Sequence, residues 1–223
     1  GQDTSDEAVV NIYLQIAPFF EYQADGPIEG GITKLDDNSI YVTASGDGVY
    51  RFNEAGDMQY KLQVNGDVKA VTTNVPNHDD PGHNIYIGST DNNLYSFYNS
   101  NNSSGNNNYY SNWTLALGGE SSASVAVDGD GNIYIGIYNG IFLSYSPDGN
   151  YFWGYNVGGI PIYCSAAITM HNDLVFVDSE GTFYFYDLDI ISGGSVEPVA
   201  EFAMGSGVVS SIAVDEIYLY ITT

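Results

Sequence analysis

The chain has almost no basic side chains. Only 4 of its 223 residues are Lys or Arg, against 28 Asp or Glu, and its formal net charge is −24. Because four cations cannot neutralise many phosphates, the composition excludes nucleic acid as a partner and disfavours an anionic membrane surface. Long apolar runs are also missing. No stretch of 18 apolar residues occurs, so the sequence encodes no transmembrane helix.

Cysteine is equally scarce. Cys164 is the only one, so no intrachain disulfide can form. With no basic residue near it in sequence to activate a thiolate, Cys164 is predicted to be a small buried apolar residue. High acidity with very little Lys is typical of a secreted, periplasmic or cell-surface protein, or of a salt-adapted one. We expect an exported location, although this sequence contains no signal peptide.

No segment shows a sustained apolar period of 3.6 residues, which predicts an almost helix-free protein. What the sequence does contain is a repeated phrase of β-branched and aromatic residues, as expected of a buried strand. The five copies start 45, 48, 41 and 43 residues apart, at Ile40, Ile85, Ile133, Leu174 and Ile217.

The segments that flank each phrase repeat as well. A strand of small residues and a polar turn precede it, as in Ser124–Val127 followed by Asp128–Asn132. A second turn rich in Gly or Asn and a third strand follow it, because hairpin turns favour residues that accept a positive φ. A fourth strand starts near an aromatic residue, and we expect two of these, Trp113 and Trp153, to pack between sheets.

Four short antiparallel strands in a period of about 44 residues are typical of a β-propeller blade. We therefore predict an all-β fold: a five-bladed β-propeller in one domain, residues 1–223. Strands at Ile12–Ile16 and Phe19–Gln23 are expected to pair with the C-terminal blade and close the ring, which would remove an exposed sheet edge. The alternative is part of a larger ring of seven or eight blades. The predicted blades are 31–64, 65–118, 119–159, 160–206, and 207–223 completed by 8–30.

The repeat resembles the PQQ-like, or quinoprotein alcohol dehydrogenase-like, propeller family. The segments that carry the resemblance are Asn84–Phe97 and Ser124–Tyr145. The resemblance implies the fold and not the chemistry. Quinone dehydrogenases of the family have eight blades, a calcium site and adjacent cysteines, whereas this chain has one Cys and half the length, so no cofactor site carries over to its residues. The resemblance therefore favours a non-catalytic member with no cofactor.

The predicted innermost strands carry no carboxylate. A five-bladed glycoside hydrolase needs a general acid and a second carboxylate that face each other across the channel. This absence makes a hydrolase the least favoured function, although loops could supply the acids. The predicted innermost strands are Ile32–Leu35, Val68–Thr72, Ser122–Val127, Cys164–Thr169 and Val209–Val214.

Five polar or aromatic residues are candidates for ligand binding. Tyr109 and Tyr110 end the Asn- and Ser-rich insertion Asn99–Asn112, where aromatic rings and amides suit a neutral polar ligand such as a sugar. The same insertion could equally be a low-complexity surface loop, and the tyrosines could be packing residues. Lys69, Ser122 and Tyr163 are candidates at the channel, in or beside the innermost strands.

One loop has the composition of a metal site. His78, Asp79, Asp80 and His83 combine imidazole and carboxylate ligands, but Asp-Pro-Gly within the loop is equally a plain turn, which we favour. Asp128–Asn132 resembles the start of a calcium loop, yet the position that requires Glu is Asn139. It is predicted to be a hairpin turn.

Three functions are compatible with these patterns. The first is a non-catalytic exported propeller that binds or assembles with another protein or a neutral or cationic small ligand, because its negative field repels acidic partners. The second is a carbohydrate-binding, lectin-like propeller, which predicts similar sugar sites in each blade. The third is a hydrolase with carboxylates on its loops.

Overall fold

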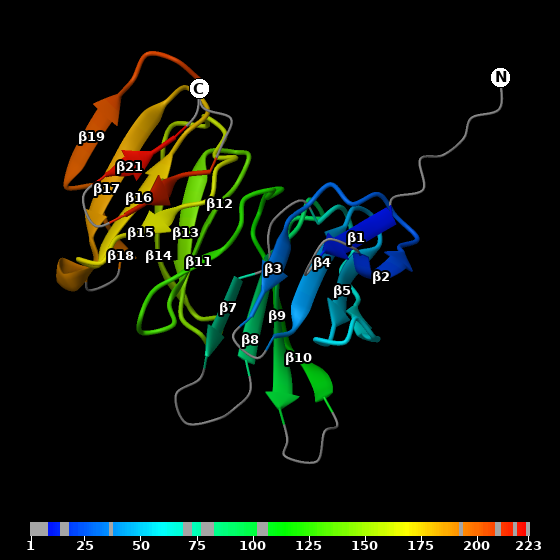
Figure 1. Ribbon diagram of the computed structural model, residues 1–223. Helices are drawn as coiled ribbons and strands as arrows, with labels where there is room; N and C mark the ends of the chain where they lie inside the picture. The colour runs from blue at the N-terminus through cyan, green and yellow to red at the C-terminus, as the bar shows by residue number, and fades with distance from the viewer. Residues whose placement is uncertain are drawn as a thin grey trace.

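In the computed structural model, the repeated phrases that start at Ile40, Ile85, Ile133 and Leu174 each lie in the second strand of an antiparallel sheet (Figure 1). The structure describes residues 9–13, 18–35, 38–68, 73–76, 83–101, 107–191, 194–207, 211–215 and 218–221. Within them the only helix is the 3-10 turn η1 (Leu188–Ile190). The predicted all-β class is therefore confirmed.

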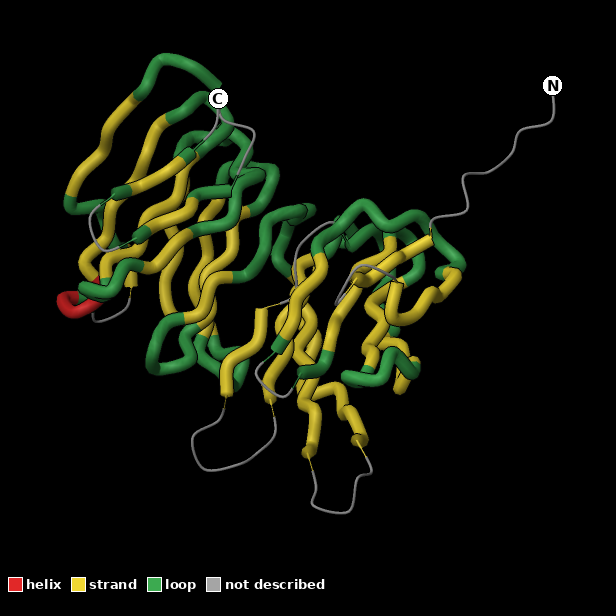
Figure 2. Tube along the Cα trace, viewed as in Figure 1, coloured by secondary structure: helices red, strands yellow, loops and turns green. Residues whose placement is uncertain are grey.

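Four sheets hold the four complete repeats (Figure 2). The first is β3 (Ile32–Lys34), β4 (Ile40–Ala44), β5 (Gly48–Phe52) and β6 (Met58–Leu62). The second is β7 (Thr73–Pro76), β8 (His83–Gly88), β9 (Asn93–Asn101) and β10 (Asn107–Ala116). The third is β11 (Ala126–Val127), β12 (Ile133–Gly136), β13 (Ile141–Tyr145) and β14 (Tyr151–Asn156). The fourth is β15 (Ala167–Ile168), β16 (Asp173–Val177), β17 (Thr182–Asp187) and β19 (Ala200–Ala203).

Three smaller pieces complete the description. Two-stranded sheets are formed by β1 (Val9–Tyr13) with β2 (Pro18–Gln23) and by β20 (Ala213–Val214) with β21 (Leu219–Tyr220). Strand β18 (Gly194–Ser195) leaves the fourth repeat and pairs in parallel with β14 of the third sheet.

The hairpin turns share one geometry. In the turn Asp128–Asn132, Asp128 N–H donates to Asn132 O, and Gly131 has a φ of +86°. In the turn Thr169–Asp173, Asn172 takes the same place with a φ of +63°. The predicted hairpin at Asp128–Asn132 is confirmed, and the physical reason is that Gly and Asn accept the positive φ that ends such turns.

Alternation along the second strands divides the large side chains between two faces. Ile133 and Ile135 are buried in the core shared with the second sheet, whereas Tyr134 between them is buried in the core shared with the fourth sheet. The same division holds for Ile85 and Ile87 against Tyr86. Because side chains of a strand point alternately to opposite faces, the second and third sheets each pack face to face with the sheet before and the sheet after.

The innermost strands β7, β11, β15 and β20 are neighbours in that order, so the sheets radiate from one side as propeller blades do. These strands are shorter than predicted. In the second sheet β7 lies at Thr73–Pro76, and most of the predicted strand Val68–Thr72 lies outside the described residues, which exclude 69–72.

The predicted closure of the ring is wrong in this structure. Hairpin β1–β2 lies at the right of Figure 1 and β20–β21 at the left, and they form separate sheets. The apolar face of β1–β2 is instead covered by the first sheet: the ring centroids of Phe20 and Tyr22 lie 5.4 and 5.1 Å from that of Phe52. Between the third and fourth sheets, the rings of Phe142 and Phe176 stack at a centroid distance of 3.9 Å. The described sheets form an open arc (Figure 1).

The insertion Asn99–Asn112 is also different from the predicted loop. Strands β9 and β10 continue into the insertion. Their pairing runs from Ala116 opposite Asn93 to Asn107 opposite Asn101, and residues 102–106 lie outside the described ranges. Tyr109 explains the extension, because it packs against Tyr60 at a centroid distance of 4.5 Å and extends the core between the first two sheets.

Candidate interaction surface

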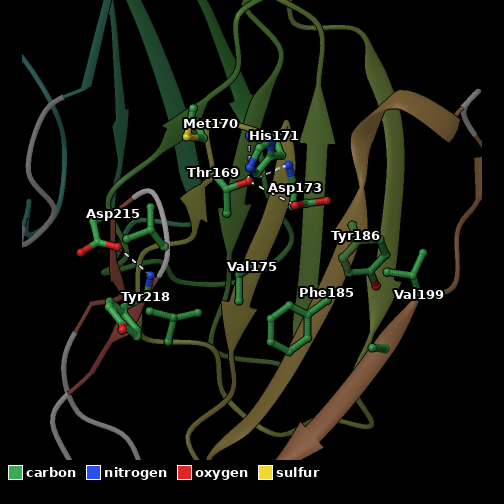
Figure 3. Close-up of a pocket in the computed structure, with 13 residues that line it drawn as sticks. Thr169, Met170, His171, Asp173, Val175, Phe185, Tyr186, Val199, Asp215 and Tyr218 are labelled. Carbon is green, nitrogen blue, oxygen red and sulfur yellow. Dashed lines mark hydrogen bonds between the residues drawn. The ribbon is translucent and has the colours of Figure 1, made fainter.

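A cleft of about 410 Å³ lies between the fourth sheet and β20–β21. Its two walls are apolar, and Figure 3 shows Thr169, His171 and Asp173 grouped at one end, with Val175 and Phe185 farther along. The apolar wall residues are Val175, Phe185, Val199 and Ala200 from the fourth sheet and Val214 and Leu219 from β20–β21. Such walls suit aliphatic or aromatic side chains.

The cleft exists because a two-stranded sheet covers only the inner half of the four-stranded one. Val175 and Phe183 are buried against Ile212 and its neighbours. The outer strand β19 is not covered in this way. Phe202 in β19 is 61% exposed, and Val199, which directly precedes the strand, is 58% exposed. On the outer strand β14 of the preceding sheet, Trp153 is fully buried, because a complete sheet lies over it.

The polar groups at the rim are engaged in turns. The hydroxyl of Thr169 accepts hydrogen bonds from the N–H groups of His171 and Asp173 and donates to the carboxylate of Asp173 at 3.2 Å. Asp215 accepts from the Tyr218 N–H at 2.6 Å and from the Tyr220 hydroxyl at 2.7 Å, and that bond raises the pKa of Tyr220. These carboxylates stabilise backbone turns.

One buried hydroxyl lies beside the cleft. Tyr186 is buried in the core between the third and fourth sheets, next to Trp153, and burial raises its pKa. Within the described residues its oxygen has no hydrogen-bond partner. Tyr186 also lines the cleft, but its hydroxyl oxygen is buried.

The outer face of β20–β21 is a second apolar surface. Strand pairing matches Tyr220 to Tyr134 of the third sheet. Tyr220 is opposite Ala213 in β20, and Tyr134 is opposite Ala126 at the same position of β11. The fifth repeat of the phrase therefore starts at Leu219, which matches Ile133, and not at the predicted Ile217. Because side chains alternate between the two faces of a strand, this shift of two residues leaves the predicted face of each side chain unchanged. Tyr134 is 1% exposed, but Tyr220 is 52% exposed because no further sheet covers it in the described structure.

Among the predicted site residues, Ser122 and Tyr163 are brought together by Tyr138. The Tyr138 hydroxyl donates to Ser122 Oγ at 2.7 Å, and its ring meets the ring of Tyr163 edge to face at 4.9 Å. Both predicted residues come from the segments that precede the short innermost strands. Tyr110 is exposed and Tyr109 is half-buried in packing, so these two side chains do not face one site.

The remaining predicted residues are not placed. Lys69, His78, Asp79 and Asp80 lie outside the described residues, and of His83 only the backbone, in β8, is described. No group of three or more His, Cys, Asp or Glu side chains suited to a metal occurs in the described part of the chain. Asp128 caps its own turn, accepting from the N–H groups of Asp130 and Asn132.

The predicted packing residues are where expected. Trp153 is buried between sheets, and Trp113 packs on Tyr86 and donates from Nε1 to Pro147 O at 3.1 Å. Cys164 is buried, and burial raises the pKa of its thiol. Sequence reasoning missed the cleft, whose walls come from two different sheets.

Solved structures provide the comparison with known proteins. The chain resembles BamB from Moraxella catarrhalis with a TM-score of 0.69 at 14% identity, over 92% of this chain and 57% of that one. It also resembles BBS1N, solved in complex with ARL6DN, with TM-scores of 0.64 and 0.62 at 15% identity. Those matches cover 93% of this chain and 64% and 65% of BBS1N.

The fold is that of a β-propeller. This chain spans less than two thirds of the length of these structures. No known family and no curated protein matches the sequence, so membership of the PQQ-like family stays a prediction. In the described residues no helix is long and apolar enough to cross a membrane.

Proposed function

We propose that this chain is a non-catalytic β-propeller module that binds another protein through the C-terminal end of its arc. One observation carries the proposal: large apolar side chains are exposed there, and one of them, Tyr220, corresponds to the buried Tyr134 of a complete sheet. The residues concerned are Met170, Val199, Phe202, Met204, Tyr218 and Tyr220, half of the exposed large hydrophobic residues found in the described structure. Contiguous exposed apolar surface typically marks a protein-interaction site.

The charge of the chain constrains the partner. With a net charge of −24, the protein repels acidic surfaces, so the partner surface is neutral or basic. The solved structures of BBS1N are complexes with ARL6DN, which supports protein binding by a fold of this kind. We further propose an exported location, on the grounds of acidic composition and scarce Lys.

The test compares two pairs of substitutions in affinity capture from the source cells, followed by mass spectrometry. The end-face variant is Phe202→Ser with Tyr220→Ser, and the matched control is Tyr110→Ser with Tyr151→Ser, which also removes two exposed aromatic rings. A partner retained by the wild type and the control but lost by the end-face variant supports the proposal. Equal capture by both variants would refute it.

A further inference from the structure

Hairpin β1–β2 has the register of the outer half of a blade. In the first and third sheets, a register shift separates the last two paired positions of the third strand, Arg51/Phe52 and Ser144/Tyr145. Hairpin β1–β2 has the same shift, between Ile12 and Tyr13. Its strands of 5 and 6 residues equal β13 and β14 in length. Phe20 is opposite Ile12, and Trp153 is opposite Ser144, in each case at the position directly before the shift. Phe20 therefore corresponds to Trp153.

Sheet β20–β21 has the register of the inner half of a blade. Ala213 and Val214 pair with Tyr220 and Leu219 as Ala126 and Val127 pair with Tyr134 and Ile133. The bond between the tyrosine and the turn aspartate is also repeated, at 2.7 Å in both places. The two end sheets are therefore complementary halves of one blade, placed at opposite ends of the arc (Figure 1).

Each half lacks the strands that the other has. In the described structure β21 pairs only with β20, so its other edge is open, and the same holds for the outer edge of β1. The cleft lies beside β21, where the outer strands of a complete blade would cover Phe185, Val199 and Phe202. An open edge next to an apolar cleft is a site for strand addition.

We propose that the occupant of this site is hairpin β1–β2 of a second copy of the chain, which adds β1 to the edge of β21 and fills the cleft. This inference rests on the proposed function, since it uses the same end face. The third sheet predicts how the two strands pair. There, Ile133 is opposite Tyr145 and Tyr134 is opposite Ser144. By analogy, Leu219 should be opposite Tyr13, and Tyr220 should be opposite Ile12. The contact is head to tail, so copies form a closed ring or an open chain.

The first measurement is the mass of the full chain by light scattering across a range of concentrations. The expected result is a mass that rises from 24.1 kDa to at least twice that value. Val199→Ser with Phe202→Ser lowers self-association about tenfold or more, because it removes apolar contacts at the cleft. Tyr110→Ser with Tyr151→Ser leaves it unchanged. Circular dichroism confirms that both variants fold.

The second measurement locates the contact. Two separately tagged chains, Ile12→Cys and Tyr220→Cys, each also carrying Cys164→Ala, are mixed and oxidised. The expected product is a disulfide-linked pair that carries both tags. The control is Val9→Cys mixed with Tyr220→Cys, because Val9 lies three positions along β1 from Ile12, the residue expected opposite Tyr220, and should not cross-link.

Three results would overturn the proposal. One is a monomeric wild type at all concentrations, and another is equal cross-linking by Val9→Cys and Ile12→Cys. The third is a disulfide within a single chain that carries both Ile12→Cys and Tyr220→Cys, since this would show closure by the same copy. If the wild type is monomeric but the end face still captures a partner, the proposed function stands and only the second copy is refuted.

Discussion

Tyr134 donates a 2.7 Å hydrogen bond to the carboxylate of Asp128 across a hairpin turn. The other oxygen of that carboxylate accepts from two backbone N–H groups of the turn. The same unit occurs at Asp178, which accepts from Tyr184, and at Asp215, which accepts from Tyr220. Part of the acidity of this chain is therefore structural, with aspartates that tie a turn to a tyrosine on a strand.

Asp178→Ala should lower the free energy of unfolding by about 2–4 kcal/mol. Asp178 is fully buried and accepts from the N–H groups of Glu180 and Thr182 and from the Tyr184 hydroxyl. Without the carboxylate, buried donors lose their acceptor. Urea denaturation measures the loss. Asp130→Ala, at an exposed turn position, is the control and should cost less than about 0.5 kcal/mol. Similar losses in both variants would contradict the structural role of Asp178.

Gly140→Ala should destabilise the protein by more than about 1 kcal/mol. Gly140 has a φ of +80°, and a Cβ there would lie 2.7 Å from the backbone of Gly159 and Ile160. Gly129→Ala is the control, because nothing lies within 4 Å of its Cβ position. Thermal and urea midpoints measure both variants. A Gly140→Ala protein as stable as the control would show that the turn can relax.

Trp153→Ala should cost about 3–5 kcal/mol, because it leaves a large void between the third and fourth sheets. The side chain is fully buried among Tyr134, Phe142 and Tyr186. Tyr151→Ala removes a ring that is 60% exposed in the same strand and should cost far less. Urea denaturation of both variants separates the two cases. Equal losses would mean that Trp153 does not anchor the contact between the sheets.

Alkaline pH should destabilise the fold through its buried tyrosines. Burial, together with the charge of Asp148, raises the pKa of Tyr86 to about 12, and burial and Asp128 raise that of Tyr134. Unfolded tyrosine ionises near pH ~10. Above that pH the unfolded chain loses protons that the folded chain keeps, so stability falls as pH rises from about 10 towards 12.

Urea midpoints and tyrosinate absorbance measured through this range check the prediction. Tyr86→Phe should reduce the pH dependence of the midpoint, whereas Tyr110→Phe, at an exposed position, should leave it unchanged. Ionisation of all 20 tyrosines near pH ~10 in the folded protein would contradict it.

The local structure of this protein was readable from the sequence. Alternation in Ile133-Tyr134-Ile135 predicts a strand buried on both faces, and Asp128–Asn132 predicts a hairpin turn, because side-chain period and positive φ are properties of a few adjacent residues. The half-blade character of both ends was also predicted, and the strand registers of β1–β2 and β20–β21 support it.

Only the tertiary structure decided how these pieces are arranged. Whether Ile12 and Tyr220 meet depends on the angle at every contact between sheets, and those angles are set by side chains far apart in sequence, such as Phe142 on Phe176. The extension of β9 and β10 likewise depends on Tyr109 finding Tyr60 in another sheet. The sequence therefore determined the strands and turns, while packing between distant residues determined the open arc and its cleft.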